Sequence, residues 1–200
     1  MMLSDIERVR YNLKELQEIE NQTEEICMEA VKQNGLALQF VKNQTEEICL
    51  EAIKQDWNAL KYVKEQTEEI CLEAIKGSSE ALLYVKVQTP KLCLIAMQIE
   101  SDVLKRMRNS DGESYWIKTK EKGSAIGVVK EQTPELCIAS VLQNGMNLAF
   151  IKEQTPAICM TAVMQNGLAL RYVEEQTPVI CLAAIQQNPE AREYVRIALD

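Results

Sequence analysis

The sequence predicts an all-α solenoid of about eight 22-residue helix-pair repeats with a degenerate N-terminal cap. Three observations support this prediction: the spacing of the cysteines, a local apolar pattern with helical periodicity around each cysteine, and a polar junction at a fixed distance after it. The seven cysteines are separated by 22 residues or by twice 22: Cys27, Cys49, Cys71, Cys93, Cys137, Cys159 and Cys181. A period of this length is typical of arrays in which each repeat buries its apolar face against its neighbours.

The first helix of each repeat, helix A, is expected to begin after a threonine. In a typical repeat Thr133 is the N-cap and Pro134 the first helical residue, where the missing N–H of proline is harmless. Glu24, Glu46 and Glu68 replace this proline in the first three repeats and favour the positive end of the helix. A helix of about eleven residues then places its apolar residues on one face. This face holds Leu136, Cys137 and Val141 together with the small Ser140.

The second helix, helix B, is expected to follow at once, near residues 146–152 in the same repeat. The residue that begins it varies, and Pro189 at this position excludes a left-handed turn because proline fixes φ near −65°. The position is therefore the first turn of helix B, and the polar residue before it is the N-cap. The junction residues are Gly35, Trp57, Ser79, Ser101, Gly123, Gly145, Gly167 and Pro189. The buried side is expected to use leucines such as Leu104 and Leu148 and a following Phe or Tyr.

The array divides into four parts that form one continuous solenoid. We expect residues 1–20 to be an N-terminal capping helix, residues 21–100 repeats one to four, and residues 131–200 repeats six to eight. Residues 101–130 form a diverged repeat or insertion, in which Tyr115 falls at the cysteine position. A glutamine precedes each threonine, and we expect these glutamines to tie the loops together through backbone hydrogen bonds rather than to catalyse a reaction.

Composition excludes several classes of protein. The net charge is −8, and residues 1–100 hold 11 Lys/Arg against 18 Asp/Glu, so nucleic acid is not expected as a ligand. No apolar run approaches the roughly 18 residues of a membrane span, and no export signal is visible, so a cytoplasmic location, in the producing or a host cell, is expected. There is no histidine, and equivalent cysteines of stacked helices are too far apart for disulfides. We expect no metal, no cofactor and no enzymatic activity.

Two recurring strings, residues 131–137 (EQTPELC) and 165–173 (QNGLALRYV), resemble the repeats of the family known as Domain of Unknown Function 4116. The resemblance covers most of residues 20–198. It implies a bacterial or phage-type protein, of a family that is often present in several copies in proteins of intracellular bacteria. The family has no assigned activity, so the resemblance transfers no functional residue, and residues 101–122 depart from its pattern.

The first candidate surface for binding a partner is the diverged segment. Within a chain of net charge −8, residues 101–122 hold six basic side chains and two neighbouring aromatic ones. Basic and aromatic side chains together are typical of interface hot spots. The candidate residues are Lys105, Arg106, Arg108, Tyr115, Trp116, Lys118, Lys120 and Lys122. Residues 115–119 and 125–129 could pair as a β-hairpin, and the alternative is a decayed repeat whose aromatic residues fill the core.

The second candidate surface is an outward stripe along helix A. In the first three repeats it carries the i,i+3 pairs Glu29/Lys32, Glu51/Lys54 and Glu73/Lys76, which we expect to be ion pairs. Later repeats place Leu142 and Met164 at the lysine position, so the stripe becomes apolar. An exposed apolar stripe favours a partner or a second copy of the chain. The alternative is that curvature of the array buries it.

The resulting expectation is a non-catalytic helical-repeat scaffold that binds a protein partner, with a homo-oligomer through the helix A stripe as one form. One alternative is an acidic inhibitor or decoy of the phage or effector type, which occupies a nucleic-acid-binding site of a host enzyme. A second alternative is an oligomer that binds a small ligand. Salt separates the first two, because a charged interface weakens with salt and an apolar one does not.

Overall fold

The computed structural model describes residues 4–12, 14–110 and 124–199, with the backbone alone for Tyr11 and residues 101–110. Throughout this part of the chain the structure is helical and contains no strand, so the all-α repeat fold is confirmed. The chain forms two compact units, Met1–Leu92 and Cys93–Asp200. Of the described helices, none is both long enough and apolar enough to cross a membrane.

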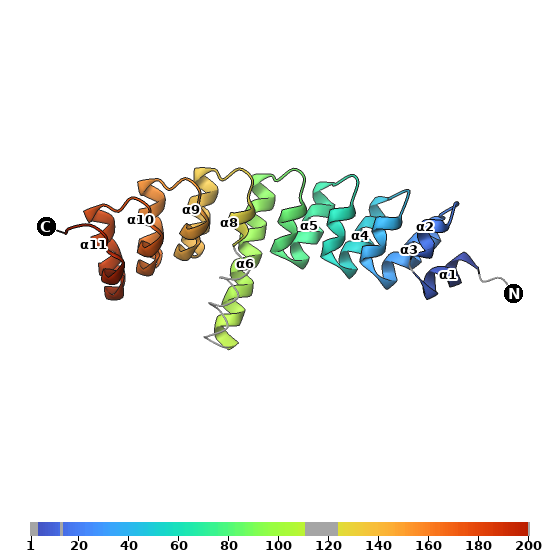
Figure 1. Ribbon diagram of the computed structural model, residues 1–200, viewed down its shortest axis with the longest axis horizontal. Helices are drawn as coiled ribbons and strands as arrows, with labels where there is room; N and C mark the ends of the chain where they lie inside the picture. The colour runs from blue at the N-terminus through green and yellow to red at the C-terminus, as the bar shows by residue number, and fades with distance from the viewer. Residues whose placement is uncertain (1–3, 13, 111–123, 200) are drawn as a thin grey trace. The chain divides into compact units, whose positions relative to one another are not determined.

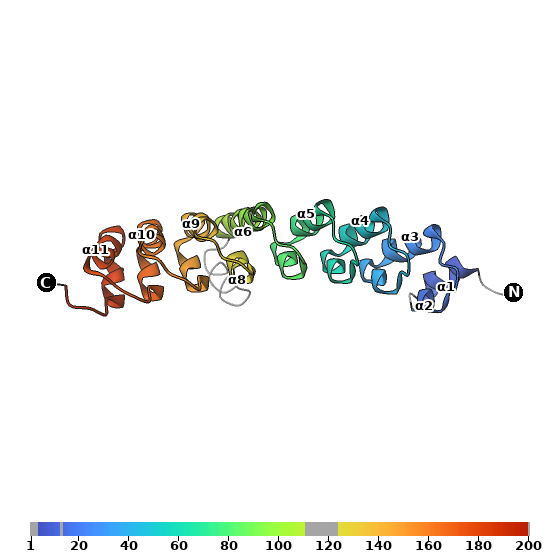
Figure 2. The ribbon, with the colours of Figure 1, turned by 90° about the horizontal axis from the view of Figure 1, so that it is seen from above.

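The first unit begins with two short helices and continues with three helix pairs, each an α-helix followed by a six-residue 3-10 helix (Figure 1). In Figure 2, α3, α4 and α5 lie in one row and their 3-10 helices in a second row. The elements are α1 (Asp5–Tyr11), α2 (Glu15–Glu18), α3 (Glu24–Gln33), η1 (Gly35–Phe40), α4 (Glu46–Gln55), η2 (Trp57–Tyr62), α5 (Glu68–Gly77) and η3 (Ser79–Tyr84).

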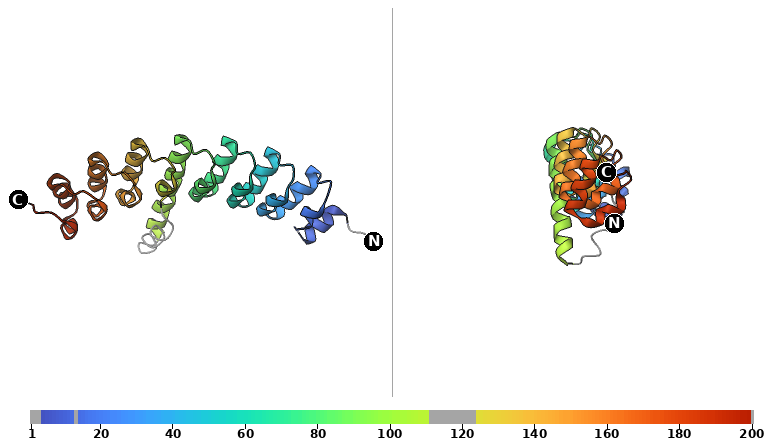
Figure 3. Two further views of the ribbon diagram at one scale, coloured as in Figure 1. Left: turned by 45° about the horizontal axis from the view of Figure 1, so that its top comes forward. Right: turned by 90° about the vertical axis from the view of Figure 1, so that its left-hand side faces the viewer.

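The second unit ends in three helix pairs of the same kind, which the left-hand view of Figure 3 shows as α9, α10 and α11 with their 3-10 partners. Before them lie a long helix, whose first three residues precede the unit boundary, and one short helix. The elements are α6 (Pro90–Ser110), α8 (Ala125–Val128), α9 (Pro134–Gln143), η4 (Gly145–Phe150), α10 (Pro156–Gln165), η5 (Gly167–Tyr172), α11 (Pro178–Gln187) and η6 (Pro189–Tyr194).

The threonine and asparagine positions set the helix boundaries as the sequence predicts. The Thr133 side chain accepts a hydrogen bond from the Leu136 N–H, and Pro134 is the first residue of α9. The Asn144 backbone is extended, and its side chain accepts from the Met146 N–H to cap η4. Helix B therefore begins at the predicted residue, but it is a six-residue 3-10 helix rather than a longer α-helix. Its last N–H, at Ile151, bonds to Leu148 O (3.2 Å).

The core of each unit is a row of identical positions from successive repeats. The cysteines and the alanines three residues after them are buried, and one leucine of each 3-10 helix in the first unit, Leu38, Leu60 or Leu82, is fully enclosed. In the second unit Leu148 and Leu170 occupy the same position and are equally enclosed. Burial of a leucine side chain contributes roughly 1.5–3 kcal/mol. Because the buried positions repeat every 22 residues, the core extends with each added repeat.

Helix α6 departs from the prediction. We expected helix A of the fourth repeat to end near Glu100 and a separate helix B to begin at Ser101, with Leu104 on its buried side. Instead one α-helix runs without a break from Pro90 to Ser110. The physical reason lies at the junction position, where Glu100 replaces the Asn, Asp or Ser that caps helix B in other repeats. Without that cap the chain continues as an α-helix.

The short helix α8 takes the place of the missing helix B. Its residue Ile126 is fully buried and lies 22 residues before Leu148, the buried leucine of η4. Gln132 donates to Ile126 O (2.9 Å) as Gln154 donates to Leu148 O (3.3 Å). The structure therefore shows seven helix A–helix B pairs in its described residues. Residues 101–110 form the last part of α6, and residues 111–124 follow it in the sequence before α8 begins.

Candidate interaction surface

The cysteines do not form a reactive or metal-binding site. All seven are free and buried, and burial raises the pKa of each thiol above its ordinary value of 9.0. The shift is largest at Cys49, where burial and then the Glu46 carboxylate raise the pKa to about 11. A protonated, enclosed thiol is a poor nucleophile and a poor ligand. The described residues also contain no cluster of three side chains suited to a metal ion.

The recurring glutamines are structural, as predicted. The Gln44 amide donates to Leu38 O in its own repeat and to Tyr62 O in the next, and its oxygen accepts from the Lys64 N–H (2.9 Å). The same three bonds recur at the other positions of what we call the glutamine ladder: Gln22, Gln44, Gln66, Gln132, Gln154 and Gln176. The amide nitrogen and oxygen of each of these side chains are thus hydrogen-bonded to the backbone of two successive repeats.

The outer side of α9, α10 and α11 is an exposed apolar surface. The exposed fractions are 59% for Leu142, 65% for Met164, 67% for Val179 and 57% for Leu182. We call the surface the α9–α11 face and define it by six residues: Ile138, Leu142, Met160, Met164, Val179 and Leu182. Helix α10 packs against both α9 and α11, so the three helices form one surface. The expected exposure of Leu142 and Met164 is therefore confirmed, and the alternative that curvature buries them is wrong.

The α9–α11 face is almost uncharged. Helices α10 and α11 contain no acidic or basic side chain, and α9 contains only Glu135 at its beginning. Contiguous apolar patches on a soluble monomer are usually small, and larger ones mark interaction sites. Sequence reasoning identified Leu142 and Met164 but missed Val179 and Leu182, which lie two residues before and one residue after Cys181.

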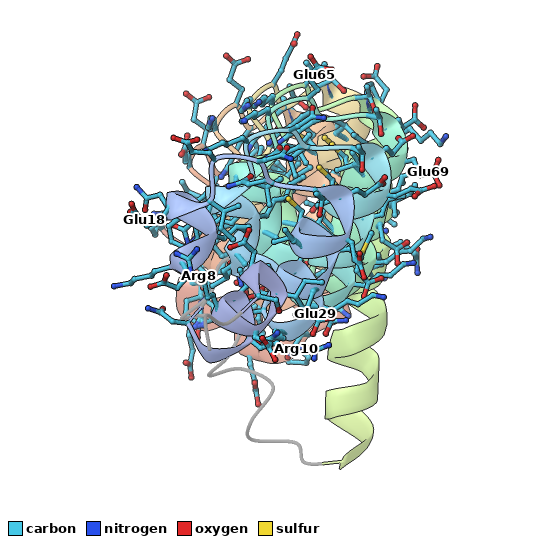
Figure 4. All side chains as sticks on the ribbon, turned by 90° about the vertical axis from the view of Figure 1, so that its right-hand side faces the viewer. Arg8, Arg10, Glu18, Glu29, Glu65 and Glu69 are labelled. Carbon is cyan, nitrogen blue, oxygen red and sulfur yellow. The ribbon has the colours of Figure 1, made fainter. Side chains whose placement is uncertain are left out.

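The equivalent side of α3, α4 and α5, in the first unit, is charged. Glu25, Glu47 and Glu69 occupy the position of Val179 and are exposed, and Figure 4 shows Glu69 pointing out from the surface. Of the three predicted i,i+3 ion pairs, all within the described residues, only Glu73/Lys76 is formed, at 3.1 Å. The other two glutamates have different partners: Glu29 pairs with Arg10 (2.8 Å), beside it in Figure 4, and Glu51 accepts from Gln55 (3.1 Å). These exposed pairs contribute little stability.

The basic and aromatic candidates of the diverged segment are placed only in part. Lys105, Arg106 and Arg108 lie on the last three turns of α6, which Figure 1 shows extending past the ends of α8 and α9. Tyr115, Trp116, Lys118, Lys120 and Lys122 lie outside the described residues. The predicted hairpin is wrong in its second arm, because residues 125–128 form the helix α8.

The Glu100 side chain bonds to the residues at the beginning of α8. Its carboxylate accepts hydrogen bonds from the Ala125 N–H (2.8 Å) and the Ser124 hydroxyl (3.0 Å). It thus performs from α6 the capping role that a junction residue performs in the regular repeats. Burial raises the pKa of Glu100, and the bonds to Ala125 and Ser124 oppose that shift. Glu100 and Ser124, which flank the diverged segment, are therefore held side by side, an arrangement that the 22-residue period alone does not reveal.

The fold defines a class, the all-α tandem-repeat proteins. Within it, residues 23–67 and 45–88 match the family model described as Domain of unknown function (DUF4116), in two overlapping segments. The match confirms for residues 23–88 the resemblance seen in the repeated sequence strings. Neither the curated proteins nor the solved structures contain a match.

Proposed function

We propose that this chain is a non-catalytic helical-repeat scaffold that binds another protein through the α9–α11 face. The observation that carries the proposal is the exposure of Leu142, Met164, Val179 and Leu182 on three adjacent helices. Leaving large apolar side chains in water is unfavourable by about 25 cal/mol per Å² relative to burying them. A bound protein removes that surface from water. The buried, protonated cysteines and the backbone-bonded glutamines agree with a scaffold rather than a catalyst.

An affinity experiment tests the proposal. The tagged chain is used to capture proteins from the producing organism, and the captured proteins are compared with those held by Leu142→Glu with Met164→Glu. We expect the double substitution to abolish capture, because it places two carboxylates in an apolar contact. The matched control is Lys32→Gln with Lys54→Gln, which changes the net charge by the same amount at the same repeat position of α3 and α4. A partner held equally by all three proteins would contradict the proposal.

The acidic decoy remains a second candidate because one observation favours it. The outer side of α3, α4 and α5 presents exposed glutamates once per repeat, at Glu25, Glu47 and Glu69. A regular row of carboxylates is suited to a basic partner surface. Binding of this kind would weaken as salt rises from about 50 to 500 mM, because the Debye length falls from above 10 Å to below 5 Å. The small-ligand oligomer stays a prediction from the sequence.

A further inference from the structure

The α9–α11 face has the properties of a surface that pairs with itself. It consists of three helices of ten residues each, in which equivalent side chains recur once per repeat. Leu142 and Met164 occupy the same position in neighbouring repeats, and Ile138, Met160 and Leu182 share another. These side chains form ridges at the spacing of packed helices, about 8–10 Å. A surface that matches the spacing of these ridges is the same face of another copy of the chain.

The distribution of charge on the chain also favours a second copy as the partner of the α9–α11 face. The chain has a net charge of −8, so two copies repel each other over most orientations. Helices α10 and α11 carry no acidic or basic side chain, which removes like-charge contacts from their part of the interface. In a two-fold arrangement whose axis runs in the interface along α10, the α9 helix of each copy lies over the α11 helix of the other. Glu135, the charged residue of α9, then meets an uncharged helix, and the two Glu135 side chains lie at opposite edges.

From these two observations we propose that a second copy of this chain docks on the α9–α11 face, with α10 of one copy packed against α10 of the other along the two-fold axis. The proposal rests on the proposed function, since it names the partner of the same surface. Ten-residue helices are about 15 Å long and lie about 9 Å apart, so three of them present roughly 400 Å² per copy. The total of about 800 Å² is below the roughly 1,000 Å² that a stable interface buries, so the dimer is weak, transient and dependent on concentration.

Sedimentation velocity of the full chain from about 1 to 500 μM tests the dimer. We expect the wild-type chain and the Lys32→Gln/Lys54→Gln control to shift from monomer to dimer, and Leu142→Glu/Met164→Glu to remain a monomer. Added salt is expected to strengthen the wild-type dimer, because it screens the repulsion between two acidic chains. A dimer that weakens with salt, or that persists in the Leu142→Glu/Met164→Glu protein, overturns the proposal.

A cysteine crosslink tests the two-fold geometry. Thr161 lies near the middle of α10 and is half-exposed, while every native cysteine is buried. Under mild oxidation Thr161→Cys is expected to form a disulfide-linked dimer, and Glu51→Cys, at the same repeat position of α4, is expected to stay monomeric. The absence of a Thr161→Cys dimer at concentrations where sedimentation shows association overturns the arrangement.

The experiments distinguish a failure of the dimer proposal from a failure of the proposed function. If the wild-type chain is monomeric at every concentration but captures another protein that Leu142→Glu/Met164→Glu does not capture, the second copy is wrong and the proposed function stands. If neither a dimer nor a captured protein depends on Leu142 and Met164, both proposals are wrong. Far-ultraviolet circular dichroism of each variant shows that its helices are intact, so a loss of association is not a loss of folding.

Discussion

A buried polar pair distinguishes the α9–η4 helix pair from the neighbouring pair. Ser140 is fully buried and Asn147 is nearly so, at positions where the neighbouring repeat has Ala162 and Ala169. The Asn147 amide donates to the Ser140 hydroxyl (2.9 Å) and to the Ser140 carbonyl (3.3 Å). The two side chains satisfy each other, so the pair adds specificity between α9 and η4 without leaving a buried polar group unpaired.

We expect a double-mutant cycle at this pair to show strong coupling. Ser140→Ala alone is expected to lower the free energy of unfolding by about 1–2 kcal/mol, because the buried Asn147 amide loses its best acceptor. Asn147→Ala alone is expected to cost about 1 kcal/mol, since the serine hydroxyl can bond to a carbonyl of its own helix. The double alanine variant restores the pattern of Ala162 and Ala169 and is expected to be as stable as wild type. Urea denaturation measures all four proteins, and additive effects would contradict the coupling.

The buried thiols make stability depend on alkaline pH. The pKa of Cys49 is about 11 in the folded chain and 9.0 when the thiol is in water, so the unfolded chain loses this proton first. The stabilising contribution is complete below pH 9 and is lost as the pH rises from 9 to about 11. We expect thiolate absorbance near 240 nm, after subtraction of the tyrosinate contribution measured at 295 nm, to appear at a higher pH in the native chain than in guanidinium chloride, because burial raises the pKa of all seven thiols. Equal titration curves would show that the cysteines are not enclosed.

At the scale of the helix, most boundaries could be predicted because each depends on one or two local residues. Thr133 with Pro134 begins α9, and Asn144 begins η4, as the capping rules require. The 3-10 geometry of η4 could not be predicted, because six residues give too short a pattern to distinguish helix types. The length of α6 was not predicted either, although its cause is local: Glu100 stands where the other repeats have a capping Asn, Asp or Ser.

The first residue of helix B is Gly167 in one repeat and Trp57 in another, and the difference has a steric reason. A Cβ atom added to Gly167 would lie 2.4 Å from Ala184 O, and the Gly167 N–H donates to the Gln187 side chain (2.5 Å). In the first unit Trp57 occupies this position, and Gly77 stands where Gln187 does. A Cβ on Gly77 would lie 3.1 Å from Trp57 Cβ, so the small residue makes room for the large one. The exchange relieves the side-chain contact at this junction, whereas the backbone contact with Ala184 O still requires glycine at position 167.

We expect two substitutions of Glu100 to have opposite effects. Burial raises the pKa of Glu100, so its charged form is unfavourable in the folded chain. Glu100→Gln keeps an oxygen for the Ala125 and Ser124 donors and removes the buried charge, and it is expected to leave stability unchanged or raise it by about 1 kcal/mol at pH 7. Glu100→Ala leaves both donors without this acceptor and is expected to lower stability by about 1–3 kcal/mol. Thermal unfolding at pH 7 compares them, and equal losses would contradict the capping role.

At the scale of the molecule, the fold class and the period could be predicted from the cysteine spacing, but the place of the diverged segment could not. An inserted segment of 22 residues leaves the distance from Cys93 to Cys137 at twice the period, as an additional repeat would. Only the bonds between Glu100 and Ser124 or Ala125, and the burial of Ile126, show that α6 and α8 form one pair. The candidate surface was predicted at Leu142 and Met164, because loss of charge is visible in the sequence.

Deletion of residues 101–122 is expected to leave a folded array. The deletion joins Glu100 to Gly123 and gives all seven cysteines a uniform 22-residue spacing. Because the chain ends at the deletion are already held together, the free energy of unfolding is expected to remain within about 2 kcal/mol of wild type. Deletion of residues 90–111 removes the same number of residues but takes away the buried Leu92, Cys93, Ala96 and Met97. Circular dichroism and urea denaturation compare the two, and equal destabilisation would contradict the insertion.

The glutamine ladder also bears on how the chain is made. Each ladder glutamine bonds to backbone groups 18 and 20 residues later in the sequence, as Gln44 does to Tyr62 and Lys64. During synthesis a repeat can therefore close as soon as the next one has left the ribosome, without waiting for the C-terminus. Glu100 must likewise wait for Ser124 and Ala125, 24 and 25 residues later. Translation is thus expected to release a chain whose earlier repeats are already folded, with little apolar surface exposed to other nascent chains.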